Sequence, residues 1–237
     1  SNSGITASDC KIFSMVQTDE CGSVVTGLKN VAEEGEQDDF DLWVMKIDLY
    51  GDVQWSETYG GSGYDAGHSI VKASNGGFII AGESSTGSAG LSDFWAVRID
   101  DGGGLVWDYR YGGPEDDSAE GVIETADGEY LLCGYTKSYG SGGYDFGMLR
   151  LTGETAAGPS GESFTWWGYS DTDEFSYDFT MKDANGFVFA GDQMFTETVT
   201  DESGSYTVTS RHAKVVSFIG GLDNEDFEKT LRAGSTE

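Results

Sequence analysis

The sequence predicts an all-β fold made from four copies of one structural unit. The first observation is a nine-residue apolar motif whose aligned glycines are Gly27, Gly82, Gly134 and Gly191, so that the copies are 52–57 residues apart. The second is that each copy holds several short segments rich in β-branched and aromatic residues. The third is that 36 glycines and only 2 prolines supply the turns between these segments. Such a repeat of several short strands is typical of β-propeller blades, and we predict a β-propeller of four four-stranded antiparallel blades.

The second copy shows the order of the four strands most clearly. Its expected strands are GHSIVKA, GFIIAGE, DFWAVRID and LVWDYRYGG, at residues 67–73, 77–83, 93–100 and 105–113. The second of these strands is apolar at successive positions, which favours a strand covered on both faces. The strands of one blade should therefore be packed between the blades before and after it.

The other copies follow the same order. In the first copy Trp43 and Trp55 match Trp95 and Trp107 of the second, whereas the fourth copy lacks these tryptophans and the Tyr-Gly-Gly that follows. We predict a single domain comprising residues 1–237, with blades at residues 9–61, 65–113, 117–170 and 174–234.

Residues 41–84 carry a resemblance to a known kind of repeat. Their sequence, DLWVMKIDLYGDVQWSETYGGSGYDAGHSIVKASNGGFIIAGES, resembles the kelch-like repeats of bacterial-type cell-surface propellers, whose units run DxWxxKxDxxGxxxWxxxYGGxxxDxxxSIxxxxDGGxxxAGxT. The resemblance covers nearly the whole chain and is strongest over residues 41–151. It implies a propeller, but it leaves the function open, because propellers serve in binding, scaffolding and catalysis alike.

The charge of the chain limits its partners. There are 42 acidic and 13 basic residues, for a net charge of −29. Such a surface repels the phosphate backbone, so we expect no nucleic-acid partner. It suits an extracellular or cell-surface setting. No stretch approaches 18 apolar residues, so we expect no insertion into a membrane.

The long loops of the predicted blades lie at one end of the sheets. In an antiparallel four-stranded blade, the loop between the second and third strands and the loop leading to the next blade emerge together. These loops are residues 31–41, 84–93, 137–145 and 194–209, and residues 60–65, 112–120 and 169–178. We call this end the acidic loop face, because it holds about 20 of the acids against Lys29 and Lys137. Binding sites concentrate on loops held by a rigid scaffold, so a protein or glycan partner is expected here.

Calcium is the one cofactor for which the sequence offers candidate ligands, because carboxylate oxygens are the ligands that calcium prefers. The candidates are Asp171, Asp173, Glu174, Glu115, Asp116 and Asp117. The segment DTDEFSYD begins like a calcium loop but lacks the glycine expected at its sixth position. The two histidines, His68 and His212, are too few and too far apart in sequence for a transition-metal site.

Three cysteines test the alignment of the first copy. Cys10 and Cys21 should stand at opposite ends of its first strand, since a strand of seven residues spans about 23 Å. A disulfide requires α-carbons within about 7 Å, so these two cysteines should not be bonded. Cys133 is expected to be a small core residue.

Taken together, these patterns predict a non-enzymatic interaction or scaffold module that uses the acidic loop face, either alone or in a homo-oligomer or larger assembly. The alternative is a carbohydrate-active propeller, which binds or hydrolyses glycans. A hydrolase needs two converging carboxylates with different pKa values, and no pair of acids in the sequence is singled out for this role. No nucleophile elbow or phosphate loop is present.

Overall fold

The computed structural model describes residues 9–32, 37–140, 143–152, 155, 157–167, 174–183, 186–201 and 204–217; the side chains of Ser163 and of all residues from 165 onward are not described. Every regular element in this part of the chain is a strand, as the sequence predicts. No helix within it has the length and hydropathy that a membrane crossing requires.

The strands form four antiparallel sheets, each made of consecutive strands in chain order. The first sheet contains β1 (Cys10–Gln17), β2 (Ser23–Asn30), β3 (Phe40–Ile47) and β4 (Val53–Tyr59). The second contains β5 (Asp65–Lys72), β6 (Phe78–Ser84), β7 (Asp93–Ile99) and β8 (Leu105–Tyr111). The third contains β9 (Asp117–Glu124), β10 (Tyr130–Thr136), β11 (Asp145–Thr152) and β12 (Gly161–Trp167). The fourth contains β13 (Glu174–Asp183), β14 (Gly186–Asp201) and β15 (Gly204–Ser217).

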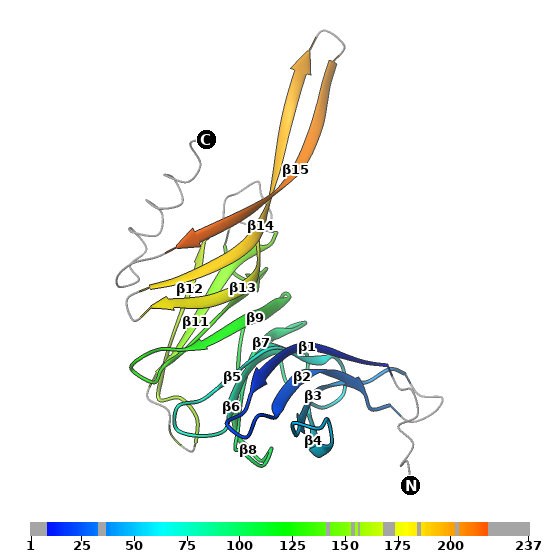
Figure 1. Cartoon of the computed structure of the whole chain (residues 1–237). Helices are drawn as coiled ribbons and strands as arrows, with labels where there is room; N and C mark the ends of the chain where they lie inside the picture. The colour runs from blue at the N-terminus through cyan, green and yellow to red at the C-terminus, as the bar shows by residue number, and fades with distance from the viewer. Residues whose placement is uncertain are drawn as a thin grey trace.

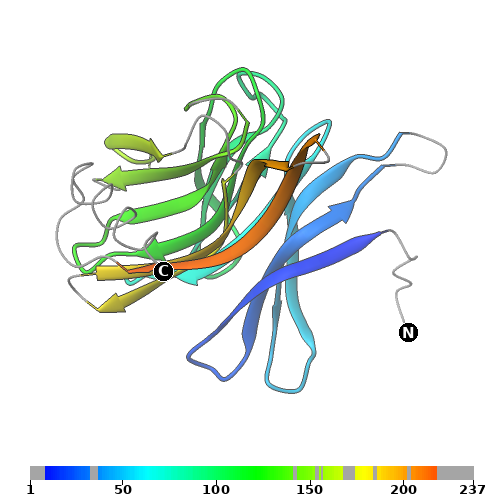
Figure 2. The ribbon, with the colours of Figure 1, turned by 90° about the horizontal axis from the view of Figure 1, so that it is seen from above.

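Successive sheets pack through their faces, with their first strands adjacent. β1 contacts β5, β5 contacts β9, and β9 contacts β13; Figures 1 and 2 show this succession from blue to orange. One apolar core lies between the first and second sheets and includes Val24, Leu42, Ile80 and Trp95. A second core lies between the second and third sheets and includes Phe94, Trp107, Leu132 and Leu149.

The first strand of each sheet carries a β-bulge at the same place, one residue beyond the residue that pairs with the repeated glycine. The pairing of β1 with β2, β5 with β6, β9 with β10 and β13 with β14 skips one residue of the first strand each time. The skipped residues are Phe13, His68, Glu120 and Tyr177. A bulge leaves its extra residue unpaired and redirects its side chain, so the same backbone device recurs in every sheet.

The repeated glycine is a consequence of this bulge. A Cβ at Gly82 would overlap the carbonyl oxygen of Ala66, two residues before the bulged His68. A Cβ at Gly27 or Gly134 would meet the carbonyl of the first strand in the same way. The glycine that defines the repeat is therefore required by a close approach of two backbones.

The fourth sheet differs from the prediction in one respect, and one part of that prediction stays untested. Residues 194–209, expected to form a loop, belong to the long hairpin of β14 and β15, which pair continuously to Asp201 and Gly204. The β-branched residues Val and Thr, repeated along this segment, favour extended strands over a loop. The expected fourth strand of this sheet, residues 227–234, lies outside the described residues.

The structure shows four successive sheets, and the described residues do not form a closed ring of sheets. None of the three cysteines forms a disulfide: Cys10 and Cys21 are exposed, and Cys133 is buried. The prediction that Cys10 and Cys21 are not bonded is therefore confirmed, and so is the core position of Cys133.

Candidate functional site

The bulge positions bring titratable side chains together at the acidic loop face. β5 starts at this face with Asp65, and β6 ends there with Ser84. The bulged His68 and the neighbouring Glu83 therefore lie near the ends of these strands at the acidic loop face. His68 Nε2 lies 3.3 Å from Glu83 Oε1, and both side chains are about 85% covered. On the other side of the imidazole, the ring of the bulged Phe13 lies 5.2 Å away between centroids. Bulged residues of two sheets are therefore in contact.

The charges around His68 favour its protonated form. Burial of the ring opposes protonation, but the hydrogen bond with Glu83 and the negative charges of Glu120 and Glu83 outweigh it. Together they raise the pKa of His68 above its ordinary value of 6.5. Glu120, the bulged residue of the third sheet, accepts a hydrogen bond from the Ser118 hydroxyl at 2.9 Å. His68 thus has carboxylates from two sheets around it.

Two tyrosines next to this cluster respond to the same charges. Burial is the largest cause, and the charges of Glu83 and Glu120 follow, in raising the pKa of both Tyr64 and Tyr135. Their hydroxyls therefore stay protonated at neutral pH. We call His68, Glu83, Glu120, Tyr64 and Tyr135 the bulge cluster. It combines negative charge with hydrogen-bond donors and an aromatic neighbour, a combination that suits recognition of a cationic group.

Lys137, a lysine of the acidic loop face, is paired with residues outside the bulge cluster. Lys137 Nζ lies 2.8 Å from Asp116 Oδ2 and 4.3 Å above the ring of Tyr144. The hydrogen bonds with Asp116 and Tyr144 raise the pKa of Lys137. Its charge is therefore committed to Asp116.

Asp117, a predicted calcium ligand, is engaged in hydrogen bonds that hold the loop end of its sheet. The side chain is fully buried. Oδ1 accepts the Thr136 hydroxyl at 2.5 Å and the backbone N–H groups of Lys137 and Ser138, at 3.1 and 3.3 Å. Oδ2 accepts the N–H of Gly113 at 2.9 Å. Asp117 is thus a structural link between β9, the end of β10 and the preceding loop.

The other predicted calcium ligands do not gather around Asp117 in the described part of the chain. Asp116 is paired with Lys137, and Glu115 is exposed. Asp171 and Asp173 lie outside the described residues. Glu174 begins β13 and pairs with Gln193, as Asp117 pairs with Thr136, but its side chain is not described. Calcium binding at these positions stays a prediction; within the described ranges, no group of three or more His, Cys, Asp or Glu side chains is placed to hold a metal ion.

Two pairs of aspartates recur where one sheet leads to the next. Asp41 stands near Asp65, and Asp93 stands near Asp117, with Gly112 between the last two carboxylates. Burial, then the charges of Asp65 and Asp39, raise the pKa of Asp41 to about 6. Burial is also the main cause of the raised pKa of Asp93.

One aspartate of each pair, Asp41 or Asp93, has the raised pKa that the general acid of a glycoside hydrolase requires. The pairs recur, however, at equivalent positions of adjacent sheets, and a catalytic pair has no reason to be repeated. Asp65 is also held as Asp117 is: it accepts the Ser84 hydroxyl, the N–H of Gly61 at 3.0 Å and the Thr86 hydroxyl at 2.8 Å. The repetition and the hydrogen bonds of Asp65 and Asp117 favour a structural role for both pairs, although Asp41 Oδ1 and Asp93 Oδ1 are buried without a hydrogen-bond partner.

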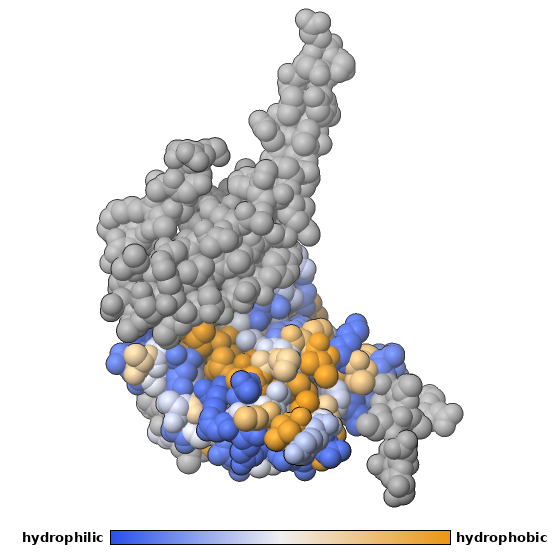
Figure 3. All heavy atoms as spheres, viewed as in Figure 1, coloured by the Kyte–Doolittle hydropathy of each residue, from blue (hydrophilic) through white to orange (hydrophobic). Residues whose placement is uncertain are grey.

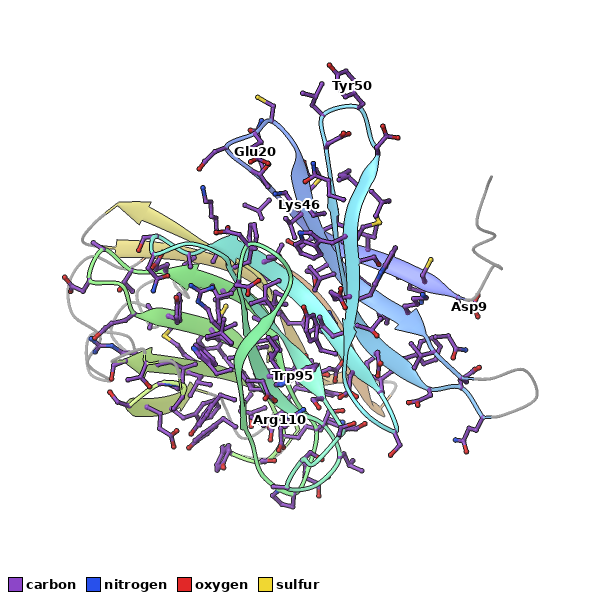
Figure 4. The ribbon with its side chains drawn as sticks, turned by 90° about the horizontal axis from the view of Figure 1, so that it is seen from below. Asp9, Glu20, Lys46, Tyr50, Trp95 and Arg110 are labelled. Atoms are coloured by element: carbon purple, nitrogen blue, oxygen red, sulfur yellow. The ribbon has the colours of Figure 1, made fainter. Side chains whose placement is uncertain are left out.

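The opposite end of the first two sheets holds a hollow of about 400 Å³ lined by Glu20, Lys46, Lys72 and Asp101, among others. Its lysines are paired with acids: Lys46 Nζ lies 3.3 Å from Glu20 Oε2, and Lys72 contacts Asp19. Figure 4 shows Glu20 and Lys46 at this end, away from Trp95 and Arg110. The Arg110 guanidinium lies 4.7 Å above the indole ring of Trp95. Both lysines of the hollow are therefore engaged by acids, and neither is left to bind an anionic ligand.

Sequence reasoning missed the bulge cluster. It treated His68 as a buried or rim histidine, because a lone histidine has no recognisable motif. The signal that could have found it is one column of the repeat alignment. This column holds Phe13, His68, Glu120 and Tyr177, each of them 14 positions before the repeated glycine. Comparison of the sequence with protein-family models and with curated proteins found no match.

Proposed function

We propose that this chain is a non-enzymatic interaction module, extracellular or at the cell surface, whose four sheets are successive blades of a β-propeller. Support for the blades comes from the face-to-face packing of consecutive sheets, their adjacent first strands and the kelch-like repeat pattern. Support for the setting comes from the net charge of −29 and from the same resemblance.

The observation that carries the binding role is the recurrent bulge. The backbone device and its facing glycine are constant, whereas the bulged residue is Phe13, His68, Glu120 or Tyr177. A constant frame that presents a different side chain in each repeat is typical of a recognition surface on a rigid scaffold. The bulge cluster is accordingly the proposed contact site.

The proposed partner is a protein segment that carries lysine or arginine. Glu83 and Glu120 carry two negative charges against the single positive charge that His68 gains on protonation, and Lys137 is paired with Asp116. The charge of the whole chain also steers a cationic partner toward the cluster. The exposed acids of the surrounding loops extend this attraction beyond the cluster.

A binding assay with a defined probe tests the proposal. A fluorescent decalysine peptide should bind the protein, and the variant Glu83→Gln with Glu120→Gln should weaken binding about tenfold at low salt, because two charge-assisted contacts are lost. Glutamine keeps the hydrogen bonds to His68 and Ser118. The matched control, Asp19→Asn with Glu20→Gln, removes the same charge from the opposite end and should change affinity less than twofold.

Equal weakening by both double variants would show that the probe responds only to overall charge and would contradict a site at the bulge cluster. Binding or cleavage of a neutral oligosaccharide, with no affinity for decalysine, would favour the carbohydrate-active alternative. In that case Asp41→Asn should abolish cleavage, since Asp41 has the raised pKa that a general acid needs.

A further inference from the structure

The first sheet has a partly exposed apolar face, whereas the corresponding face of the second sheet is buried. When the sheets are aligned on Gly27 and Gly82, the second sheet turns Ile70, Ile80, Trp95, Val97 and Ile99 toward the first sheet. All five side chains are at most 4% exposed. The third sheet turns the equivalent residues Val122, Leu132, Leu149 and Leu151 toward the second sheet, equally buried. This face is therefore the one that receives the preceding sheet.

On the first sheet, the equivalent face consists of Met15, Val25, Trp43, Met45 and Ile47. We call it the receiving face. Met15 is 65% exposed, whereas its equivalent Ile70 is 4% exposed. Trp43, Met45 and Ile47 are only half-buried. Figure 3 shows hydrophobic surface exposed on the side of the molecule where β1 lies. Val25, at 6% exposed, is covered by its neighbours. The first sheet thus leaves four of the five equivalent positions wholly or partly uncovered.

The receiving face already has the arrangement of a covered one. Trp95, buried between sheets, donates its indole N–H to Asp108 at 3.0 Å on the adjacent fourth strand. Trp43 donates its indole N–H to Ser56 at 2.8 Å, from the equivalent position to the equivalent strand. The largest side chain of the face is therefore held in the same way with and without a covering sheet, which lowers the ordering cost of docking.

The fourth sheet offers the complementary surface. The first sheet meets the second with Val24, Leu42 and Val44. At the equivalent positions of the fourth sheet, counted from Gly191, the register places Val188, Ala213 and Val215. This sheet contacts the third through β13, as the third contacts the second through β9. The packing order of the other sheets therefore assigns these register positions to the face that does not meet the third sheet. One chain therefore carries a receiving face at one end of the row and a donating face at the other.

We propose that the receiving face of the first sheet binds the fourth sheet of a second copy of this chain, head to tail. In this structure the fourth sheet of the same chain leaves Met15 exposed, so the sheet that covers the receiving face comes from a second copy. The contact repeats the sheet-to-sheet packing already made twice within the chain. A head-to-tail contact of this kind closes into a ring when the rotation allows it. The proposal rests on the sheets alone and is independent of the partner proposed above.

Light scattering on the full chain tests whether copies associate. The mass should rise with protein concentration toward at least a dimer, more readily at high salt, because salt screens the repulsion between two strongly acidic copies. The variant Met15→Glu with Met45→Glu should remain monomeric, since it places charge in an apolar contact. Leu91→Glu, at an equally exposed apolar loop residue away from the face, should associate as the native chain does. A native chain that is monomeric throughout would overturn the proposal.

Crosslinking identifies which sheets meet. In a background with Cys10→Ser and Cys21→Ser, one batch carries Met15→Cys and another carries Val215→Cys. A short bismaleimide should join the two batches into a mixed dimer, located by mass spectrometry. If instead the crosslink forms only inside single molecules that carry both changes, the fourth sheet covers the first within one chain, and the second-copy proposal fails. Crosslinks that join Met15→Cys only to itself would overturn the head-to-tail arrangement.

Discussion

Gly82 of β6 lies directly against the carbonyl oxygen of Ala66 in β5, so closely that a Cβ at position 82 would overlap it. The contact arises because β5 bulges at His68, between the residues that pair with Gly82 and Ala81. The same contact recurs in the first and third sheets. The repeated glycine is thus required because the bulged strand comes too close for a Cβ. The same bulge presents the residue that we propose for binding.

Replacement of this glycine should therefore be costly. Gly82→Ala forces the backbones of β5 and β6 apart, and we expect a loss of at least about 2 kcal/mol in the free energy of unfolding. Urea denaturation measures it. The matched control is Gly102→Ala in an exposed turn, where the nearest atom is the flexible side chain of Asp100 at 3.3 Å. Equal stability of the two variants would show that β5 has no such bulge in solution.

The pair Asp41 and Asp65 predicts a pH dependence of stability. The pKa of Asp41 rises from 3.8 to about 6 on folding, mainly through burial and the charge of Asp65. Its contribution to stability is complete below pH 3.8 and is lost as the pH rises through 6. Asp41→Asn should therefore stabilise the protein at pH 7.5, by the order of 1 kcal/mol after allowance for solvent screening, and have little effect at pH 4.

Thermal melts of Asp41→Asn from pH 4 to pH 8 test this dependence. Asp52→Asn, in an exposed turn of the same sheet, is the control for the change in net charge. A gain that is the same at every pH, or the same in the control, would contradict the assigned cause.

Cys21 occupies a backbone conformation that favours glycine. Its φ is +63°, and the equivalent turn of the second sheet has Gly76 at +94°. Cys21→Gly should raise the free energy of unfolding by about 0.5–1 kcal/mol, because relief of left-handed strain exceeds the added freedom of the unfolded chain. The reciprocal change Gly51→Ala, at φ +87° in open space, should lower it by a similar amount. Calorimetry of both variants decides the matter; a loss of stability in Cys21→Gly would refute the assignment.

The Arg98 side chain stabilises a turn through hydrogen bonds, and we assign it no role in ligand binding. Its buried guanidinium donates to the carbonyl oxygens of Ile99 at 2.5 Å and Phe78 at 3.3 Å, and to Asn75 Oδ1 at 2.7 Å. Arg98→Met should cost about 2–3 kcal/mol, because buried acceptors lose their donors. Arg150→Met, at the equivalent but half-exposed position beside Glu129, should cost less than about 1 kcal/mol. Guanidinium denaturation compares the two, and a smaller loss for Arg98→Met would be inconsistent with this role.

Much of the fold could be predicted from the sequence, because the strand segments and turn glycines recur in each copy. The alternation, the glycines and the tryptophans of the first three copies place their strands to within a few residues, and the second strands are buried on both faces as predicted. The fourth copy has no such tryptophans, and its Thr- and Val-rich segment 194–209 could not be assigned by comparison with the others. The β14–β15 hairpin was therefore missed.

The site was harder to predict for a physical reason. Acidic loops are visible in composition, but composition does not show which carboxylates are engaged in hydrogen bonds. Asp117 accepts four hydrogen bonds, whereas Glu83 acts on His68 from the adjacent strand and Glu120 acts on it from the next sheet. That difference arises from strand register and from a bulge, which a single sequence does not reveal. The repeat alignment does show the variable column, once the glycine is understood as the mark of a bulge.

The titration of His68 by NMR tests the binding role of the bulge cluster most directly. His212→Gln leaves His68 as the sole histidine, so its ring signal can be followed alone. In the free protein its pKa should lie above 6.5, and saturating decalysine peptide should lower it, because the cationic probe takes up the charge of Glu83 and Glu120. A pKa at or below 6.5 in the free protein, or one that saturating probe leaves unchanged, would contradict the account.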